Sequence, residues 1–197
     1  MQITSQELRQ LKAQAEQLTG IKADNFDLKP LYDIQGFSPA ALAAAGAKVT
    51  FYDDKQDDVA LRSPIIPTGD LANSQVHVVV GVELNLHAAP ALPDADLEEH
   101  TLRCKRMHLE LTCGTDTLYN ERAGFAYGGD AAVDTSGDAA QARGRYYPIS
   151  PYVAAQNDSY KAVLKNGDSA VTWTSIITTT QAECIVWALV SGHRKDS

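Results

Sequence analysis

The stretch from Val76 to Leu86, VHVVVGVELNL, decides the fold that this sequence predicts. Valine or leucine occupies every second position, at Val76, Val78, Val80, Val82, Leu84 and Leu86. A period of two places alternate side chains on one face of an extended strand, and β-branched valine suits a pleated strand better than a helix. We therefore expect a long strand whose six apolar residues all face a second layer of structure.

Other segments on both sides of this stretch also have the composition of strands. They are residues 48–52, 107–113, 159–165, 170–180 and 184–190. The last is apolar on both faces, which is typical of a central strand, and Asn166-Gly167 predicts a hairpin between the third and the fourth. A short strand is also expected near Leu118-Tyr119, within a long irregular segment (114–145). The sequence thus predicts a mainly β chain, an antiparallel β-sandwich of jelly-roll type with a short helical N-terminal arm.

The N-terminal arm begins with a helix that has its own start and stop signals. Thr4 and Glu7 form a capping box, and Gly20 follows the last turn. Between them, apolar residues recur at spacings of three and four and form a narrow stripe: Leu8, Leu11, Ala15 and Leu18. A helix of this length is marginally stable alone, so the stripe needs a partner surface on the parent domain, a neighbouring subunit or a membrane. We predict that contacts between subunits are made by Leu8, Leu11 and Leu18.

The pattern divides the chain into two parts. Residues 1–47 are predicted to form the helical arm and a linker, and residues 48–197 the β-sandwich domain. Residues 21–37 show no sustained period and contain Pro30 and Gly36, which favours an irregular linker. A short Ala-rich helix is expected to begin at Ser38-Pro39, because serine is a good helix cap and proline suits the first helical position.

Composition narrows the classes of function. The formal net charge of −8 argues against a surface specific for nucleic acid. No apolar run approaches the roughly 20 residues that span a bilayer, and the first residues lack the basic and apolar regions of a signal peptide. The three cysteines, Cys104, Cys113 and Cys184, cannot all pair within one chain, and two lie in strand patterns. Reduced thiols in the core are therefore expected.

No catalytic residue, cofactor site or metal site is predicted. His108 and Glu110 face one side of a strand, but a metal site needs three or four convergent ligands. The paired-histidine strand motif of the cupin jelly rolls is absent. The Asp-Thr-Ser-Gly run at Asp134 lacks the second aspartate that an aspartic protease requires, and the acidic groups within 53–58 and 130–138 match no defined calcium loop. The sequence therefore argues against an enzyme.

The layout of a capped N-terminal helix, an irregular arm and a jelly-roll-like body with long loops resembles the capsid proteins of tailless icosahedral phages. In that family the jelly roll forms the shell, and terminal arms reach neighbours or an internal membrane. The resemblance implies a virion shell component, synthesised in the host cytoplasm, that assembles through its sandwich and its arm with copies of itself or with other virion proteins. It rests on architecture and transfers no functional residues.

Two alternatives from other classes remain open. One is a carbohydrate- or ligand-binding β-sandwich, whose stacking platform would be Trp173, Trp187 or the group Tyr146, Tyr147 and Tyr152. The other is an enzyme of unrecognised type. The mass of the purified protein under native conditions separates a shell protein from a monomeric binding module.

Overall fold

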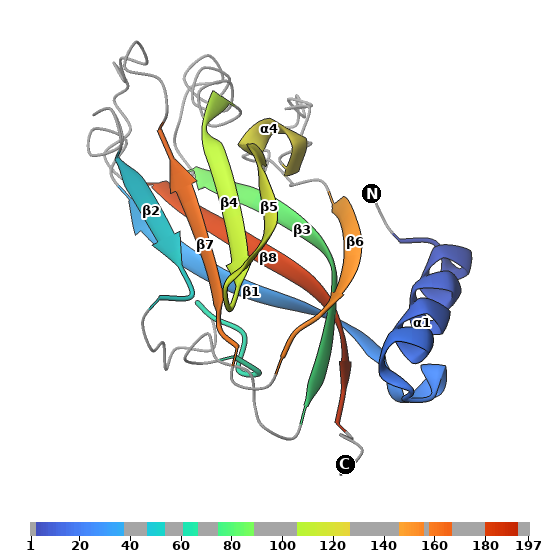
Figure 1. Cartoon of the computed structure of the whole chain (residues 1–197). Coiled ribbons are helices and arrows are strands. Elements are labelled where there is room, and N and C mark those ends of the chain that lie inside the picture. The colour runs from blue at the N-terminus through green and yellow to red at the C-terminus, as the bar shows by residue number, and fades with distance from the viewer. Residues whose placement is uncertain are drawn as a thin grey trace.

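The computed structural model describes most of the sheet-forming chain. The described residues are 3–37, 47–53, 61–66, 75–88, 106–126, 146–155, 158–166 and 180–192. Within them the protein is mainly β, with two antiparallel four-stranded sheets and one long helix at the N-terminus, consistent with a β-sandwich (Figure 1). The predicted fold class is confirmed at this level.

The first sheet has the strand order β1-β8-β3-β6 and the second has the order β2-β7-β4-β5. The strands of the first sheet are β1 (Asp27–Phe37), β8 (Thr180–Ser191), β3 (Val76–Ala88) and β6 (Tyr147–Val153). Those of the second are β2 (Lys48–Phe51), β7 (Tyr160–Lys165), β4 (His108–Cys113) and β5 (Asp116–Arg122). The helices in the described ranges are α1 (Ser5–Thr19), the 3-10 turn η1 (Ala23–Asn25) and the short α4 (Ala123–Ala126). Figure 1 shows α1 outside the two layers, beside the first sheet.

The main core lies between the two sheets. Alternation along β4 follows the predicted pattern, because Leu109, Leu111 and Cys113 are buried while the residues between them are half-buried. From the other sheet, Val82, Leu84 and Val186 belong to the same apolar cluster. Strand β8 lies between β1 and β3, which confirms that the apolar segment 184–190 is central.

The apolar residues of β3 are divided between two faces by a β-bulge. Val79 and Gly81 pair with the consecutive β8 residues Ala188 and Trp187, so Val80 is one extra residue on β3. Before the bulge, the alternate valines contact the helical arm; beyond it, alternate residues enter the core between the sheets. The first group is Val76, Val78 and Val80, and the second is Val82 and Leu84. The prediction that all six residues share one face is therefore wrong, and the side chain of Leu86 lies outside the described residues.

Tyr146 completes the bulge. Its hydroxyl donates to the carbonyl oxygen of Val80 at 2.8 Å, which gives that carbonyl a partner where the bulge disturbs the strand pairing. Its ring lies directly over Gly81, where a Cβ atom would come within 2.1 Å of it. Gly81 is thus required by close approach of a side chain, a reason that the apolar period does not reveal.

The sequence predicted an irregular linker over residues 21–37, but only part of this segment is irregular. Residues 27–37 form β1, which pairs with β8 along its whole length, so the expected domain boundary at residue 48 falls after a strand of the first sheet. Pro30 is tolerated because β1 is an edge strand, where a missing backbone donor costs little. The Ala-rich helix expected from Ser38-Pro39 lies outside the described residues.

The predicted hairpin between residues 159–165 and 170–180 is also wrong. Strand β7 pairs with β2 on one side and β4 on the other, which leaves no free edge for a third strand. Thr180 belongs to β8, in the opposite sheet, and residues 167–179 lie outside the described residues. The Asn166-Gly167 signal is local, whereas the partners of β7 are chosen by burial in the second sheet.

A buried polar cluster connects β1 to the end of β2. The carboxylate of Asp33 accepts hydrogen bonds from the Arg62 guanidinium at 2.9 and 3.0 Å and from the Tyr52 backbone N–H at 2.6 Å. The Tyr52 hydroxyl lies 2.8 Å and 2.6 Å from the carbonyl oxygens of Leu31 and Cys184. Tyr52 has a left-handed backbone conformation, with φ of 64°, and these hydrogen bonds hold it there. Each partner thus satisfies a charge or polar group that would be costly to bury alone, and the cluster links β1 of the first sheet to the residue that follows β2 of the second.

We expect Gly81→Ala to lower the free energy of unfolding by about 1–3 kcal/mol, because the added methyl group forces the Tyr146 ring away from the bulge. Gly36→Ala is the matched control: Gly36 lies on β1, and nothing lies within 4 Å of the position that an added Cβ atom would take. The stability of this control should therefore stay unchanged or rise slightly. Urea denaturation of both variants measures the difference. Equal free energies of unfolding for the two variants would show that the Tyr146 ring does not restrict the side chain at position 81.

Candidate functional site

Helix α1 has the predicted caps and docks on its own domain. The capping box between Thr4 and Glu7 is formed, and Gly20 ends the helix in the left-handed conformation. The apolar stripe lies on the outer face of the first sheet, where Ala15 is fully buried and Leu8 and Leu11 are half-buried. The sequence left three partner surfaces open for this stripe. The structure shows that most of it packs on the parent domain.

Leu18 does not share in this docking. Its side chain is 55% exposed, which makes it one of two large exposed apolar residues in the described part of the chain. The predicted subunit-contact residues thus separate into two kinds. Leu8 and Leu11 pack against the first sheet of the same molecule, and Leu18 stays exposed on the surface.

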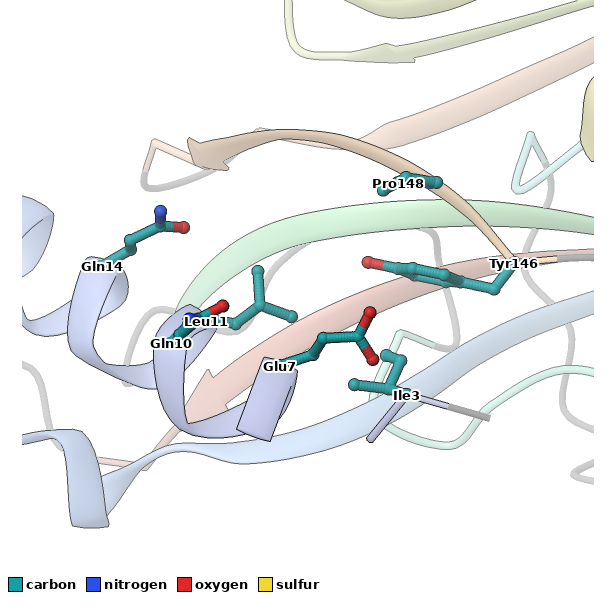
Figure 2. A pocket seen from close by; sticks show the side chains of 7 residues that line it. All are labelled: Ile3, Glu7, Gln10, Leu11, Gln14, Tyr146 and Pro148. Carbon is teal, nitrogen blue, oxygen red and sulfur yellow. The ribbon is translucent and has the colours of Figure 1, made fainter. Parts of the chain in front are cut away.

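A groove of about 250 Å³ runs between α1 and the start of β6 (Figure 2). Its walls are Ile3, Glu7, Gln10, Leu11, Gln14, Tyr146 and Pro148. Figure 2 shows the side chains of Glu7 and Leu11 extending from the helix toward the ring of Tyr146. Apolar and amide groups therefore line most of the groove, with one carboxylate among them.

The carboxylate in the groove is already used by the helix cap. Glu7 accepts hydrogen bonds from the backbone N–H and the hydroxyl of Thr4, both at 2.7 Å, and these bonds lower the pKa of Glu7. On the other wall, burial raises the pKa of Tyr146, and the nearby charge of Glu7 raises it further. The groove at neutral pH therefore presents a neutral phenol and a carboxylate held in place by the helix.

A second, shallower cleft of about 500 Å³ lies between β5 and β6, the strands at the edges of the two described sheets. It is lined by residues 117–121 of β5 and 147–152 of β6. The rings of Tyr119 and Tyr147 meet edge to face across it, with centroids 5.2 Å apart, and the Tyr152 hydroxyl donates to Asp116 at 2.7 Å. This hydrogen bond is the main cause of the raised pKa of Tyr152. The cleft is thus bridged by two contacts between the sheets.

The aromatic platform suggested by the sequence is split by this geometry. Tyr147 and Tyr152 line the cleft, while Tyr146, which precedes β6, lines the groove. Trp187 packs against the cluster under α1 and donates its indole N–H to Glu83 at 3.0 Å, so its ring serves packing. Trp173 lies outside the described residues.

The candidate metal ligands have other partners. The His108 ring contacts the side-chain oxygen of Asn120, and Glu110 pairs with Lys165, which lowers the pKa of that carboxyl. Asp53 pairs with Lys161 at 3.2 Å. In the described ranges no three histidine, cysteine or acidic side chains converge as a metal site would require. The remaining members of the two acidic groups lie outside those ranges.

Two of the three cysteines are buried free thiols, as expected. Cys113 and Cys184 have no disulfide partner, and burial raises the pKa of Cys113 to about 12. A thiol with so high a pKa is protonated and a poor nucleophile at neutral pH. These cysteines therefore belong to the core, and Cys104 lies outside the described residues.

Neither surface feature could be found from a sequence motif. The groove joins residues 3–14 to Tyr146 and Pro148, and the cleft joins two strands about 30 residues apart. The helix pattern identified Glu7 and Leu11, whereas nothing local indicates that Tyr119 or Pro148 lines a surface hollow. No family model, curated protein or solved structure matches this chain. None of the helices in the described ranges is long and apolar enough to cross a membrane.

The buried His77 predicts a pH dependence of stability. Its ring nitrogens lie 3.2 Å from the Tyr160 hydroxyl and 3.1 Å from the Gln75 side-chain oxygen, and burial lowers its pKa to about 4. In the unfolded chain the pKa is near 6.5, so between these values the unfolded state binds more protons. The free energy of unfolding should therefore fall, by roughly 3 kcal/mol, as the pH drops from 6.5 to about 4.

Urea denaturation across this pH range tests the prediction, with His77→Gln as the comparison. The variant lacks the titrating group, so the difference in stability between the two proteins should narrow toward pH 4. A difference that stays constant across the range would show that His77 does not carry this dependence.

Proposed function

We propose that the two sheets form a jelly roll and that the protein is a structural component of a virion shell. In this proposal it assembles with copies of itself or with other virion proteins through its sandwich and its N-terminal arm. The observation that carries the proposal is the order in which the strands pair.

The strand pairs are nested. The first strand pairs with the last, β1 with β8, and the inner pairs are β2–β7, β3–β6 and β4–β5, all antiparallel. In a chain paired in this way, strands β1 to β4 form one side of a long antiparallel ribbon and strands β5 to β8 form the other. The chain reverses direction between β4 and β5. Winding such a ribbon places alternate pairs in alternate sheets, as in the orders β1-β8-β3-β6 and β2-β7-β4-β5. This order supports a jelly roll, an architecture used by viral capsid proteins, lectin domains and cupins.

Further observations favour a shell protein within this group. The sequence lacks the paired-histidine motif of cupins. The arm is folded as a helix against the outer face of the first sheet, where it offers Leu18 and the α1–β6 groove to solvent. Exposed apolar features beside one another on an outer face favour protein–protein contact.

The native mass of the purified full-length chain tests this function. We expect a large closed assembly, visible by native mass spectrometry and negative-stain electron microscopy, because jelly-roll shells repeat one contact around symmetry axes. Raising the ionic strength should leave the particles intact if apolar contacts hold them together. A monomer at all concentrations and salt conditions would contradict the proposal.

A second candidate is a carbohydrate-binding module, which the β5–β6 cleft favours. The half-exposed ring of Tyr147 offers an apolar surface beside the polar side chains of Asn120, Glu121 and Ser150. Aromatic faces attract the weakly positive C–H groups of a sugar ring, and the polar groups can bond its hydroxyls.

Titration with neutral oligosaccharides, followed by calorimetry, tests this candidate. Tyr147→Ala should weaken any saccharide binding at least tenfold, because it removes the aromatic surface. Tyr32→Ala is the matched control, since Tyr32 lies half-buried on β1, at the opposite edge of the same sheet. Equal effects of the two substitutions, or no binding by the wild-type chain, would exclude the cleft as a sugar site.

A further inference from the structure

We propose that two copies of this chain pair through the flank of α1 that faces β6, each inserting Leu18 into the α1–β6 groove of the other. The pairing deepens the proposed assembly function and rests on it. It identifies which surface of the arm meets a neighbour, and which part of the neighbour it meets.

Leu18 and the groove lie on the same flank of the helix. Leu18 follows Leu11 by seven residues and Gln14 by four, and both of these residues line the groove. Residues spaced by four or seven lie one above another on a helix. Leu18 therefore projects from the same flank, about 10 Å further along the axis than Leu11. An exposed apolar side chain and an apolar-walled groove are thus neighbours on one surface.

Apart from Glu7, whose carboxylate caps the helix, the charged side chains of α1 lie away from this flank. Arg9, Lys12 and Glu16 follow one another at spacings of three and four on the opposite flank, where Glu16 also accepts a hydrogen bond from the Ala23 backbone N–H at 3.1 Å. The flank that faces β6 carries the amides of Gln10 and Gln14, and the one carboxylate there, Glu7, is bound to Thr4. Depletion of charge at the centre of a surface is typical of protein interfaces.

A two-fold axis satisfies both halves of the contact at once. In a two-fold dimer the same patch is used on both subunits, so a protruding residue and its receptor can lie on one surface. An axis that passes between Leu18 and the groove makes the two helices antiparallel and brings each Leu18 to the other copy's groove. Gln14 then lies near the axis, where its amide can both donate to and accept from its counterpart. A second copy is therefore the partner that fits this flank.

The test uses the full-length chain with Leu18→Glu. Because Leu18 is more than half exposed, the variant should keep the wild-type circular dichroism and melting temperature. We expect sedimentation velocity across a concentration series to show association weakened at least tenfold, since a carboxylate would enter an apolar groove. Ala13→Glu is the matched control: Ala13 is exposed on α1, and the substitution adds the same charge away from the flank. It should associate like the wild type.

A charge pair tests the contact between the two positions. Gln10→Lys places an ammonium group in the groove wall. A mixture of this variant with Leu18→Glu protein should form tighter heterodimers than a mixture of Leu18→Glu with the wild type. In the first mixture the new glutamate of one copy enters the groove that carries the new lysine of the other. Equal affinity of the two mixtures would overturn the proposed contact.

The outcomes separate this pairing from the shell function. Large particles formed equally well by Leu18→Glu would overturn the pairing and leave the shell function standing. A wild-type dimer that forms no particles, and that Leu18→Glu dissociates, would support the pairing and contradict the shell function. A wild-type monomer at every concentration would contradict both.

Discussion

The extra residue at Val80 is the constraint on which the arrangement of the first sheet and the arm depends. Without a bulge, alternate residues of β3 would keep one parity and the long apolar pattern would face a single layer. With it, Val76, Val78 and Val80 form a platform for α1, while Val82 and Leu84 fill the core between the sheets. One strand thereby serves two apolar clusters. The docked position of the arm follows from this division.

The sequence predicted best the strands that have one face buried in the core and the other face nearer to solvent. Strand β4 has one buried and one half-buried face, so its alternation is visible in the sequence. Strand β1 was missed because Pro30 and a mixed pattern hide a strand that lies at a sheet edge. The hairpin after β7 was wrong because a local turn signal says nothing about which edges are free. Pairing is decided by burial over the whole sheet, and a single turn cannot specify it.

The candidate site was predictable only in its helical half. The spacing of Leu8, Leu11 and Leu18 identified a stripe that needs a partner, and the helix caps fixed its ends. The spacing could not identify the surface on which the stripe docks, because that surface is formed by residues of β3 and β8 together with Phe26. Tyr146 is a further example. Its role depends on a bulge in a strand that precedes it by more than 60 residues.

The arm therefore belongs to the fold and to the surface at the same time. Removing α1 would expose Val78, Val80 and Leu189, which have no solvent-exposed surface in the intact chain, so it would destabilise the fold as well as remove the proposed contact surface. Leu18 is separable because its side chain is mostly outside the docked cluster. A helix whose apolar stripe is longer than the surface it docks on leaves apolar side chains exposed at one end. In this chain that exposed apolar end, Leu18, lies on the flank where Glu7 is the one charged side chain that lines the groove between α1 and β6.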